Sequence, residues 1–399
     1  MTSTPTARGR TAPALLRDRN FGPFVVGKIV SSCGVWIGQI AAAVLMFELT
    51  RSAFMVGAVS MMLFAGPLLL ALWTGALVDR RDRRHLLMVG RGISALAAGM
   101  LALLLVGSGV NPQVLLVSAA VMGVGHAVSL PAMQALTPGL VPDEDLEQAL
   151  AFASVAPSIA RTVGPALGAG LLVVGGPELA FATAALTHAS FVLVLAVVRA
   201  RPQRREDGRP SIFGGLRYLV HDRTTLLLMA GVAMMGFGAD PVITLTPSLA
   251  DRLGGGSELV GLFASVFGVG AVLVVVAFRR LRGMLTLRLV GVAGYLVVGL
   301  GLVVAAVVPS VQGAAIGFLI NGAGFMMATV ALTTRIQRRV PDELRGRVMA
   351  LWGVAFLGSR PVAAPINGAV ADLVSVQAAM LAAAAVVVAA ALLARVRYP

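Results

Sequence analysis

Charged residues are scarce in this sequence. They make up 13% of its 399 residues, whereas hydrophobic residues make up 58%. Soluble domains carry about 25% charged residues, so this composition excludes an ordinary soluble domain. It predicts a polytopic protein embedded in a lipid bilayer.

Cysteine and the short motifs of common enzymes are also missing. The one cysteine, Cys33, lies in an apolar run, which excludes an intramolecular disulfide and a cysteine-based metal cluster. The sequence contains no H-E-x-x-H, no G-x-S-x-G and no phosphate-binding loop. These absences predict a protein that is not an enzyme, has no cofactor or metal, and does not drive transport with its own nucleotide-binding domain.

A cleavable signal peptide is not evident. The first 19 residues are polar and rich in arginine, and the apolar segment after them is too long for a signal-peptide core. We therefore expect an uncleaved first membrane helix.

The formal net charge of +14 is distributed unevenly. Of the 32 basic residues, 26 lie in segments that are expected to face one side of the membrane. These segments are the N-terminus, the loops near 80–84, 199–223, 279–288 and 335–347, and the C-terminal tail with Arg395 and Arg397. Loops rich in arginine stay in the cytoplasm, so both termini are predicted to be cytoplasmic in a bacterial plasma membrane. The charge therefore reflects topology and contact with anionic lipid headgroups. It does not indicate nucleic-acid binding.

The apolar runs are long enough to cross a bilayer, which takes about 20 residues. They begin near Phe21, Phe54, His85, Val114, Leu146, Leu179, Leu226, Leu259, Leu285, Gln312, Arg347 and Val374. This pattern predicts an all-α membrane protein with twelve transmembrane helices.

The longest polar break divides the chain into two halves. We expect a cytoplasmic N-terminus over 1–20, a six-helix bundle over 21–199, a cytoplasmic linker over 200–223, and a second six-helix bundle over 224–396. The end of the linker carries apolar residues on one helical stripe, which predicts a short amphipathic helix lying on the membrane surface.

Four short segments recur in the same order in both halves. The pairs are Asp18-Arg19 with Asp222-Arg223, Ser52–Gly57 with Ser257–Gly261, Leu140–Glu144 with Val340–Glu343, and Gly164–Ala169 with Ala364–Ala369. Because each half has an even number of helices, these repeats are expected to be parallel. A substrate site is expected near the bilayer midplane, where the repeats meet.

A short polar loop lies between the second and third predicted helices. It holds six charges between Asp79 and Arg84, with Gly75 on the preceding helix. A topology signal requires the arginines but not the acid. The order G-x-L-x-D-R-x-x-R-R resembles the signature loop of the major facilitator superfamily. The resemblance implies a gating motif made of Gly75, Asp79, Arg80, Arg83 and Arg84.

Two further segments resemble facilitator exporters of the enterobactin-exporter and macrolide-efflux type. They are 130–143 and 160–170, and the first helix around 32–52 agrees with them. Within the second segment, Gly164, Pro165 and Gly168 form a G-P-x-x-G-x-G pattern similar to the motif associated with drug:proton antiporters. A tight helix crossing would explain the same residues. Val35 and Gly90 stand where relatives often carry an acid, so coupling schemes tied to those positions are not carried over.

Polar groups inside the predicted spans are candidate site residues, because buried ionisable groups in membranes face cavities or partners. Arg161 and Arg360 each lie about 18 Å into their helices at 1.5 Å per residue. With Gln39 and Asn321 they form the predicted substrate cavity. The alternative for each arginine is a structural contact with helix-end carbonyls or a carboxylate.

Asp240 lies similarly deep, next to Pro241, and is the main candidate for carrying a proton. Glu48 and His126 are further candidates, although buried histidines also occur as packing residues.

These features favour a secondary active transporter of a small molecule, working as a monomer by alternating access. Proton-driven efflux of an amphiphilic drug, siderophore or secondary metabolite is the preferred hypothesis. An importer and a non-transporting membrane receptor or scaffold remain alternatives. Two central arginines against one acid favour an anionic or neutral substrate. The sequence does not identify it.

Overall fold

The computed structural model describes residues 12–107, 109–199 and 212–395, and every regular element within them is a helix. The N-terminal group of helices comprises α1 (Ala12–Leu16), α2 (Phe21–Thr50), α3 (Ala53–Leu69), α4 (Ala71–Arg80), α5 (Arg83–Gly107), α6 (Pro112–Leu136), η1 (Thr137–Leu140), η2 (Asp143–Asp145) and α7 (Leu146–Val197). The C-terminal group comprises α8 (Ile212–His221), α9 (Arg223–Ala239), α10 (Pro241–Thr244), α11 (Thr246–Arg252), α12 (Ser257–Met284), α13 (Leu287–Val307), α14 (Val311–Arg339), α15 (Asp342–Gly358), α16 (Arg360–Leu373) and α17 (Val376–Ala394).

Within the described ranges, nine helical segments are long and apolar enough to cross a membrane. The helices α3 and α17 are apolar but shorter. The helix α7 is interrupted at Gly175 and Gly176, and Gly176 has a φ of 67°, which is a conformation that favours glycine. The fold is therefore that of an all-helical multi-pass membrane protein.

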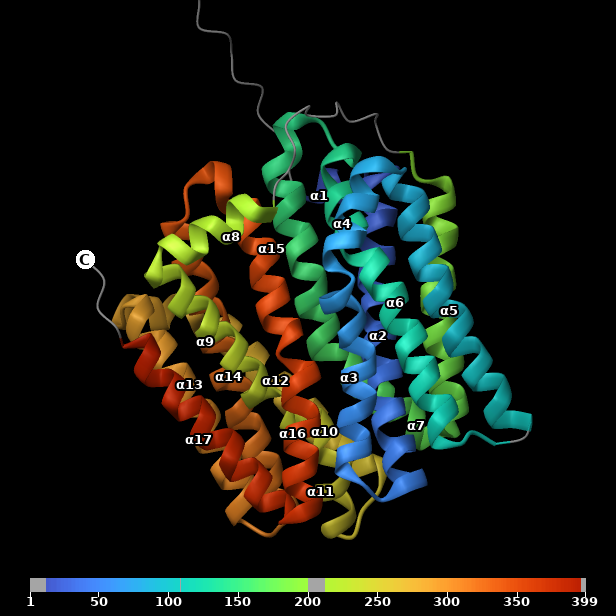
Figure 1. The fold of residues 1–399 in the computed structure, drawn as a ribbon, viewed down its shortest axis with the longest axis vertical. Coiled ribbons are helices and arrows are strands. Elements are labelled where there is room, and N and C mark those ends of the chain that lie inside the picture. The colour runs from blue at the N-terminus through green and yellow to red at the C-terminus, as the bar shows by residue number, and fades with distance from the viewer. Residues whose placement is uncertain (1–11, 108, 200–211, 396–399) are drawn as a thin grey trace, which may run out of the picture.

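The helices of the two groups lie side by side along most of the molecule (Figure 1). In the N-terminal group, α2 packs along α7, where the rings of Phe24 and Phe191 lie 5.9 Å apart between centroids. A large hydrophobic core fills the C-terminal group between α9, α13, α14 and α17. Packing within each group and between them thus positions the polar residues of the interior.

The two groups make direct contact at the predicted outer end. A Cβ atom on Gly57 of α3 would lie 2.4 Å from the carbonyl oxygen of Ala364, so the backbones of α3 and α16 touch there. The carboxylate of Asp372 accepts hydrogen bonds from the Ser52 hydroxyl and from the backbone N–H groups of Ala53 (2.8 Å) and Phe54 (3.0 Å). It therefore caps the first turn of α3 from the other group.

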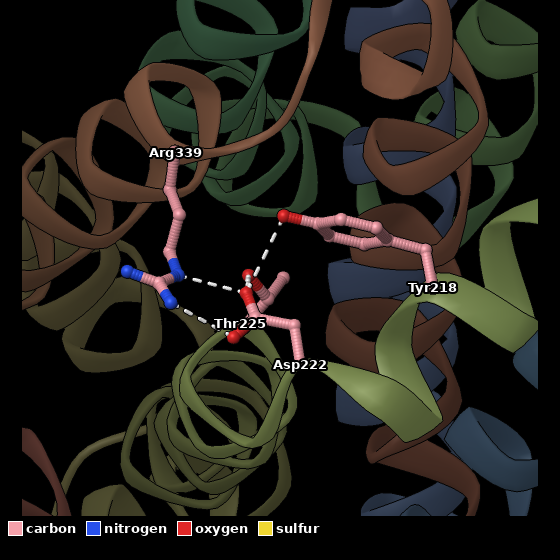
Figure 2. Close-up of polar contacts among 4 residues, drawn as sticks. All are labelled: Tyr218, Asp222, Thr225 and Arg339. Carbon is pink, nitrogen blue, oxygen red and sulfur yellow. Dashed lines mark hydrogen bonds and ion pairs between the residues drawn. The ribbon is translucent and has the colours of Figure 1, made fainter.

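A polar cluster connects α8, α9 and α14 at the opposite end (Figure 2). Asp222 accepts two hydrogen bonds from the Arg339 guanidinium, at 2.7 and 2.9 Å, and one from the Thr225 hydroxyl at 2.6 Å. The Tyr218 hydroxyl donates to the same carboxylate at 3.4 Å. The hydrogen bonds from Arg339 hold the pKa of Asp222 well below its usual range. This cluster connects α8, the segment predicted to be an amphipathic helix, to the ends of α9 and α14.

Candidate functional site

Two neighbouring helices are interrupted at the same depth in the C-terminal group. Asp240 separates α9 from α10, where Pro241 lacks a backbone N–H, and Ser359 separates α15 from α16. The two interruptions lie close together. Gly236 is about one helical turn before Asp240 on α9, and a Cβ atom on it would lie 1.8 Å from the Ser359 hydroxyl oxygen. Broken helices in membrane proteins are tolerated where they are buried in protein or line a cavity. The breaks thus mark a candidate site.

Asp240 is held by two neutral donors. The Thr244 hydroxyl donates to Oδ1 at 2.9 Å and the Asn367 amide donates to Oδ2 at 2.8 Å. The side chain is buried, with 1% of its surface exposed. Arg360 attracts the carboxylate electrostatically, but the ion pairs found among the described residues do not include these two. The acid is therefore close to a cation without being neutralised by direct contact.

Arg360, at the first position of α16, faces aromatic rings of the N-terminal group. Its Cζ atom lies 5.1 Å from the ring centroid of Trp36 and 5.0 Å from that of Phe64. Its Nη1 donates to Gln39 at 3.5 Å, while its buried Nε has no hydrogen-bond partner. Cation–π contacts of this kind are attractive and leave N–H groups available for a ligand.

Arg161 makes the reverse contact. It belongs to α7 in the N-terminal group, and its Cζ lies 4.9 Å from the ring centroid of Phe356 and 5.6 Å from that of Phe325 in the C-terminal group. Its Nε is also buried without a hydrogen-bond partner. Each group thus presents one arginine to two aromatic rings of the other.

A narrow cavity of about 20 Å³, room for about one water molecule, lies between these contacts. Its walls include Trp36, Arg161, Pro165, Phe325 and Arg360. Two cationic groups with free donors, set among aromatic and aliphatic walls, suit a compound with an anionic or polar end and an apolar body.

The other residues predicted for the cavity have different surroundings. Gln39 reaches Arg360 from α2 and also borders a second, apolar cavity within the N-terminal group. Asn321 is fully buried and donates to the carbonyl oxygens of Gly238 (3.2 Å) and Val298 (3.4 Å). It braces α14 against α9 and α13 and is not among the residues that line the central cavity.

The further candidates for proton coupling also lie away from the cavity. Glu48 is exposed near the predicted outer end, in the electrostatic field of Arg51 and Glu178. His126 is buried within the N-terminal group, and its Nε2 has no hydrogen-bond partner. Of the three predicted carriers, Asp240 alone lies beside Arg360.

The antiporter-like motif lies where α7 packs on α2. A Cβ on Gly164 would lie 2.6 Å from Cβ of Trp36, and one on Gly168 would lie 2.9 Å from Cα of Ile37. Pro165 lies between these glycines and lines the cavity. The motif therefore allows the close crossing that sets Trp36 beside Arg360.

The predicted gating loop connects three helices. Arg83 donates to the carbonyl of Ala135 at 3.0 Å, and Arg84 donates to the carbonyls of Leu195 and Ala196 at the end of α7. Arg80 is exposed and Gly75 is half-buried. The side chain of Asp79 lies outside the described part of the structure.

Six residues of this site were not singled out from the sequence. Trp36, Phe64, Phe325 and Phe356 contact the arginines, and Thr244 and Asn367 hold Asp240. Two of them carry a sequence signal, since Trp36 lies in the segment around 32–52 and Asn367 is a polar residue of the recurring segment 364–369. The phenylalanines are indistinguishable in sequence from ordinary core residues.

Membrane-length helices around a central cavity lined by two arginines define a multi-pass membrane transporter. The chain belongs to the major facilitator superfamily, in the family described as transmembrane secretion effectors, which it matches over residues 10–399.

Individual relatives agree with this assignment. The chain is 25% identical to the enterobactin exporter EntS of Shigella boydii serotype 4 over 371 residues, which cover 89% of this chain and 86% of the relative. Its fold is similar to that of the nucleoside transporter NupG, with a TM-score of 0.74, 13% identity and coverage of 93% and 97% of the two chains. A bacterial homologue of the iron transporter ferroportin in an inward-facing state has a TM-score of 0.70, 17% identity and coverage of 96% and 98%.

Proposed function

We propose that this protein is a secondary active transporter that exports a small amphiphilic compound, anionic or neutral, in exchange for protons. The observation that carries the proposal is the reciprocal placement of Arg161 and Arg360. Each guanidinium lies within 6 Å of aromatic rings from the opposite helix group. A substrate bound by both would be held by both groups of helices, as alternating access requires.

The two helix groups act as six-helix bundles in this proposal. Counting α7 as two crossings that meet at Gly175 and Gly176 adds one span to the nine long segments, and α3 and α17 complete twelve. Equivalent packing supports the repeats, because Gly57 meets Ala364 of α16 and Gly261 meets Ala169 of α7. These four residues come from the recurring segments.

In this proposal the Asp372 cap lies on the outer side and the arginine-rich ends lie in the cytoplasm. With the outer contacts formed, this conformation corresponds to a state closed to the outside. Export then requires the contacts between α3 and α16 to separate after the substrate has entered from the cytoplasm.

Proton coupling is assigned to Asp240. Its carboxylate accepts from Asn367 of α16 and lies in the field of Arg360, the first residue of that helix. A substrate that donates a hydrogen bond to the Asp240 carboxylate while its polar end contacts Arg360 would bind only when Asp240 is deprotonated. Proton and substrate would then exclude one another at this site, as exchange requires.

Direct flux measurement tests the proposal. A compound panel in cells with and without the protein would identify a candidate, and purified protein in liposomes would then be assayed under an imposed pH gradient. We expect accumulation of the compound on the side corresponding to the exterior, collapsing when a protonophore removes the gradient. Transport in the opposite direction would make the protein an importer. The absence of flux for compounds that bind would favour the receptor or scaffold alternative.

A further inference from the structure

A second set of buried basic groups lies within the N-terminal group of helices. It consists of Lys28 on α2, Arg91 on α5, His126 on α6 and His188 on α7, and each exposes at most 5% of its surface. Lys28 and Arg91 lie seven and eight residues after the first residue of their helices, and His126 and His188 lie ten and nine residues before the last residue of theirs. These four helix ends are on the predicted cytoplasmic side. At 1.5 Å per residue this depth is roughly 10–15 Å. We call these four residues the basic cluster.

Positive charge on one member of the basic cluster disfavours positive charge on the others. Arg91 acts electrostatically on Lys28 and on both histidines, and His126 acts on His188. Among the residues whose side chains the structure describes, no carboxylate forms an ion pair with Arg91 or attracts it electrostatically. An arginine remains charged in proteins, and a buried charge without a counter-charge is strongly unfavourable. The cluster therefore requires negative charge from elsewhere.

Several hydrogen-bond donors of the cluster are unused. The Nε and Nη1 atoms of Arg91 and the Nε2 atoms of His126 and His188 are buried and have no partner among the described residues. The Nδ1 atom of His188 pairs with the Ser31 hydroxyl at 2.9 Å. When that hydroxyl donates to Nδ1, Nε2 carries the ring hydrogen and becomes a donor. Arg91 and the two histidines thus offer up to four donors.

The helices α5 and α6 pack backbone to backbone next to Arg91 and His126. A Cβ on Gly90 would lie 2.6 Å from the Gly125 carbonyl oxygen, and one on Gly125 would lie 2.6 Å from the Gly90 carbonyl oxygen. The helices α5 and α6 touch at this point, between Arg91 and His126. The nearby hydroxyls of Ser94 and Ser129 donate to backbone carbonyls of their own helices. Close packing of these helices favours a small counter-ion over a bulky one.

We propose that the basic cluster binds a monovalent inorganic anion of the chloride class. The site is separate from the central cavity, since none of its residues lines that cavity. Lys28 contributes charge while its Nζ donates to the Ala153 carbonyl at 2.8 Å, and the unused donors of Arg91, His126 and His188 contact the ion. The bound ion would neutralise the interior of four packed helices and stabilise their arrangement.

Thermal unfolding of the purified full-length protein in detergent tests this site. In separate titrations, potassium chloride, bromide or nitrate would replace potassium gluconate at constant ionic strength. Potassium sulfate would replace it in a further series. We expect chloride, bromide and nitrate to raise Tm by about 2–5 °C in a saturable manner, because the ion binds the folded state. Equal Tm values in chloride and gluconate would refute the site. An equal effect of sulfate would indicate general salt stabilisation and would also refute it.

Variants locate the ion. Arg91→Gln should abolish the chloride-dependent shift, whereas Arg91→Lys should retain part of it. Arg161→Gln is the matched control, since it removes a buried arginine from the central cavity, and it should keep the full shift. Loss of the shift in Arg161→Gln but not in Arg91→Gln would place the ion in the central cavity and refute the proposal.

A direct observation does not depend on the variants folding. Anomalous diffraction from crystals of the unmodified protein grown with bromide should give a peak between Arg91, His126 and His188. Ordered water there without an anomalous peak would refute the proposal.

Discussion

The guanidinium of Arg161 lies 4.9 Å from the ring centroid of Phe356, on the far side of the boundary between the two helix groups. The contact holds a cation at the cavity, and within the described part of the chain no carboxylate forms an ion pair with Arg161. A salt bridge at this position would neutralise the charge, whereas the aromatic face leaves it able to attract an anion. Arg360 makes the same kind of contact in the opposite direction.

Substitution of Arg161 should distinguish substrate recognition from structure. We expect Arg161→Ala to lower affinity for an anionic substrate about 10–100-fold, because charged hydrogen bonds contribute about 1.5–3 kcal/mol. Affinity for a neutral analogue should fall much less. Binding titrations with a matched pair of compounds measure this difference, and Arg161→Lys should give an intermediate loss for the anion. Equal losses of affinity for both compounds would show that Arg161 has a structural role.

Asp240 should control coupling. Asp240→Asn cannot lose a proton, so uphill export driven by a pH gradient should be abolished while downhill exchange remains measurable. Liposome flux with and without a gradient separates these activities. Glu48→Gln is the control, because Glu48 is exposed and distant from the cavity, and it should keep coupled export. Full accumulation by Asp240→Asn would assign coupling to another group.

The Asp372 cap should stabilise the state closed to the outside. Asp372→Ala removes the acceptor for two backbone N–H groups of α3, which costs about 0.5–2 kcal/mol for a helix cap. In a Cys33→Ser background, a cysteine introduced by Ile40→Cys would report opening through its reaction with an impermeant maleimide. We expect faster labelling in Asp372→Ala.

A nearby surface ion pair provides the comparison for this cap. Arg51 and Asp251 are 2.6 Å apart, but their side chains are 66% and 52% exposed. Exposed ion pairs contribute little, so Asp251→Asn should leave the labelling rate nearly unchanged. An equal effect of both substitutions would contradict a specific role for the Asp372 cap.

The Asp222–Arg339 contact should make stability depend on pH in a defined direction. The pKa of Asp222 is lowered by Arg339, so the stabilisation is complete above the ordinary aspartate pKa and is lost as pH falls through the lowered value. The free energies of unfolding of the unmodified protein and of Asp222→Asn should therefore differ by a constant amount, about 1 kcal/mol, near neutral pH. The difference should shrink only in strong acid. A difference that disappears near neutral pH would contradict the assignment.

Asp79 should be required for transport but not for insertion. In the outward-open state its carboxylate is expected to approach the start of α15, where unpaired backbone N–H groups favour an anion. Asp79→Asn should thus reduce flux at least about tenfold, which corresponds to 1.4 kcal/mol in the affected step. Protease accessibility of the loops should be unchanged, since the arginines still set topology. Near-normal flux would exclude this gating role.

Much of the architecture was predictable because apolar length and arginine placement act locally. Each run of about 20 apolar residues must form a helix to satisfy its backbone groups in lipid. The superfamily could be recognised from the Gly75–Arg84 loop and the Gly164–Gly168 motif, which the match over residues 10–399 confirms. Arg161, Arg360 and Asp240 were identified as candidates because buried ionisable groups are rare and costly.

The partners of those residues were determined only by tertiary structure. Phe356 and Phe64 resemble any core residue in the sequence, and they become cation-binding surfaces because α15 and α3 pack opposite Arg161 and Arg360. Asn321 was expected in the cavity, yet its amide braces three helices of the C-terminal group. Hydropathy determines how deep a side chain lies in the membrane. Which face of its helix meets a cavity depends on helix rotation and on the close crossings that the glycines permit.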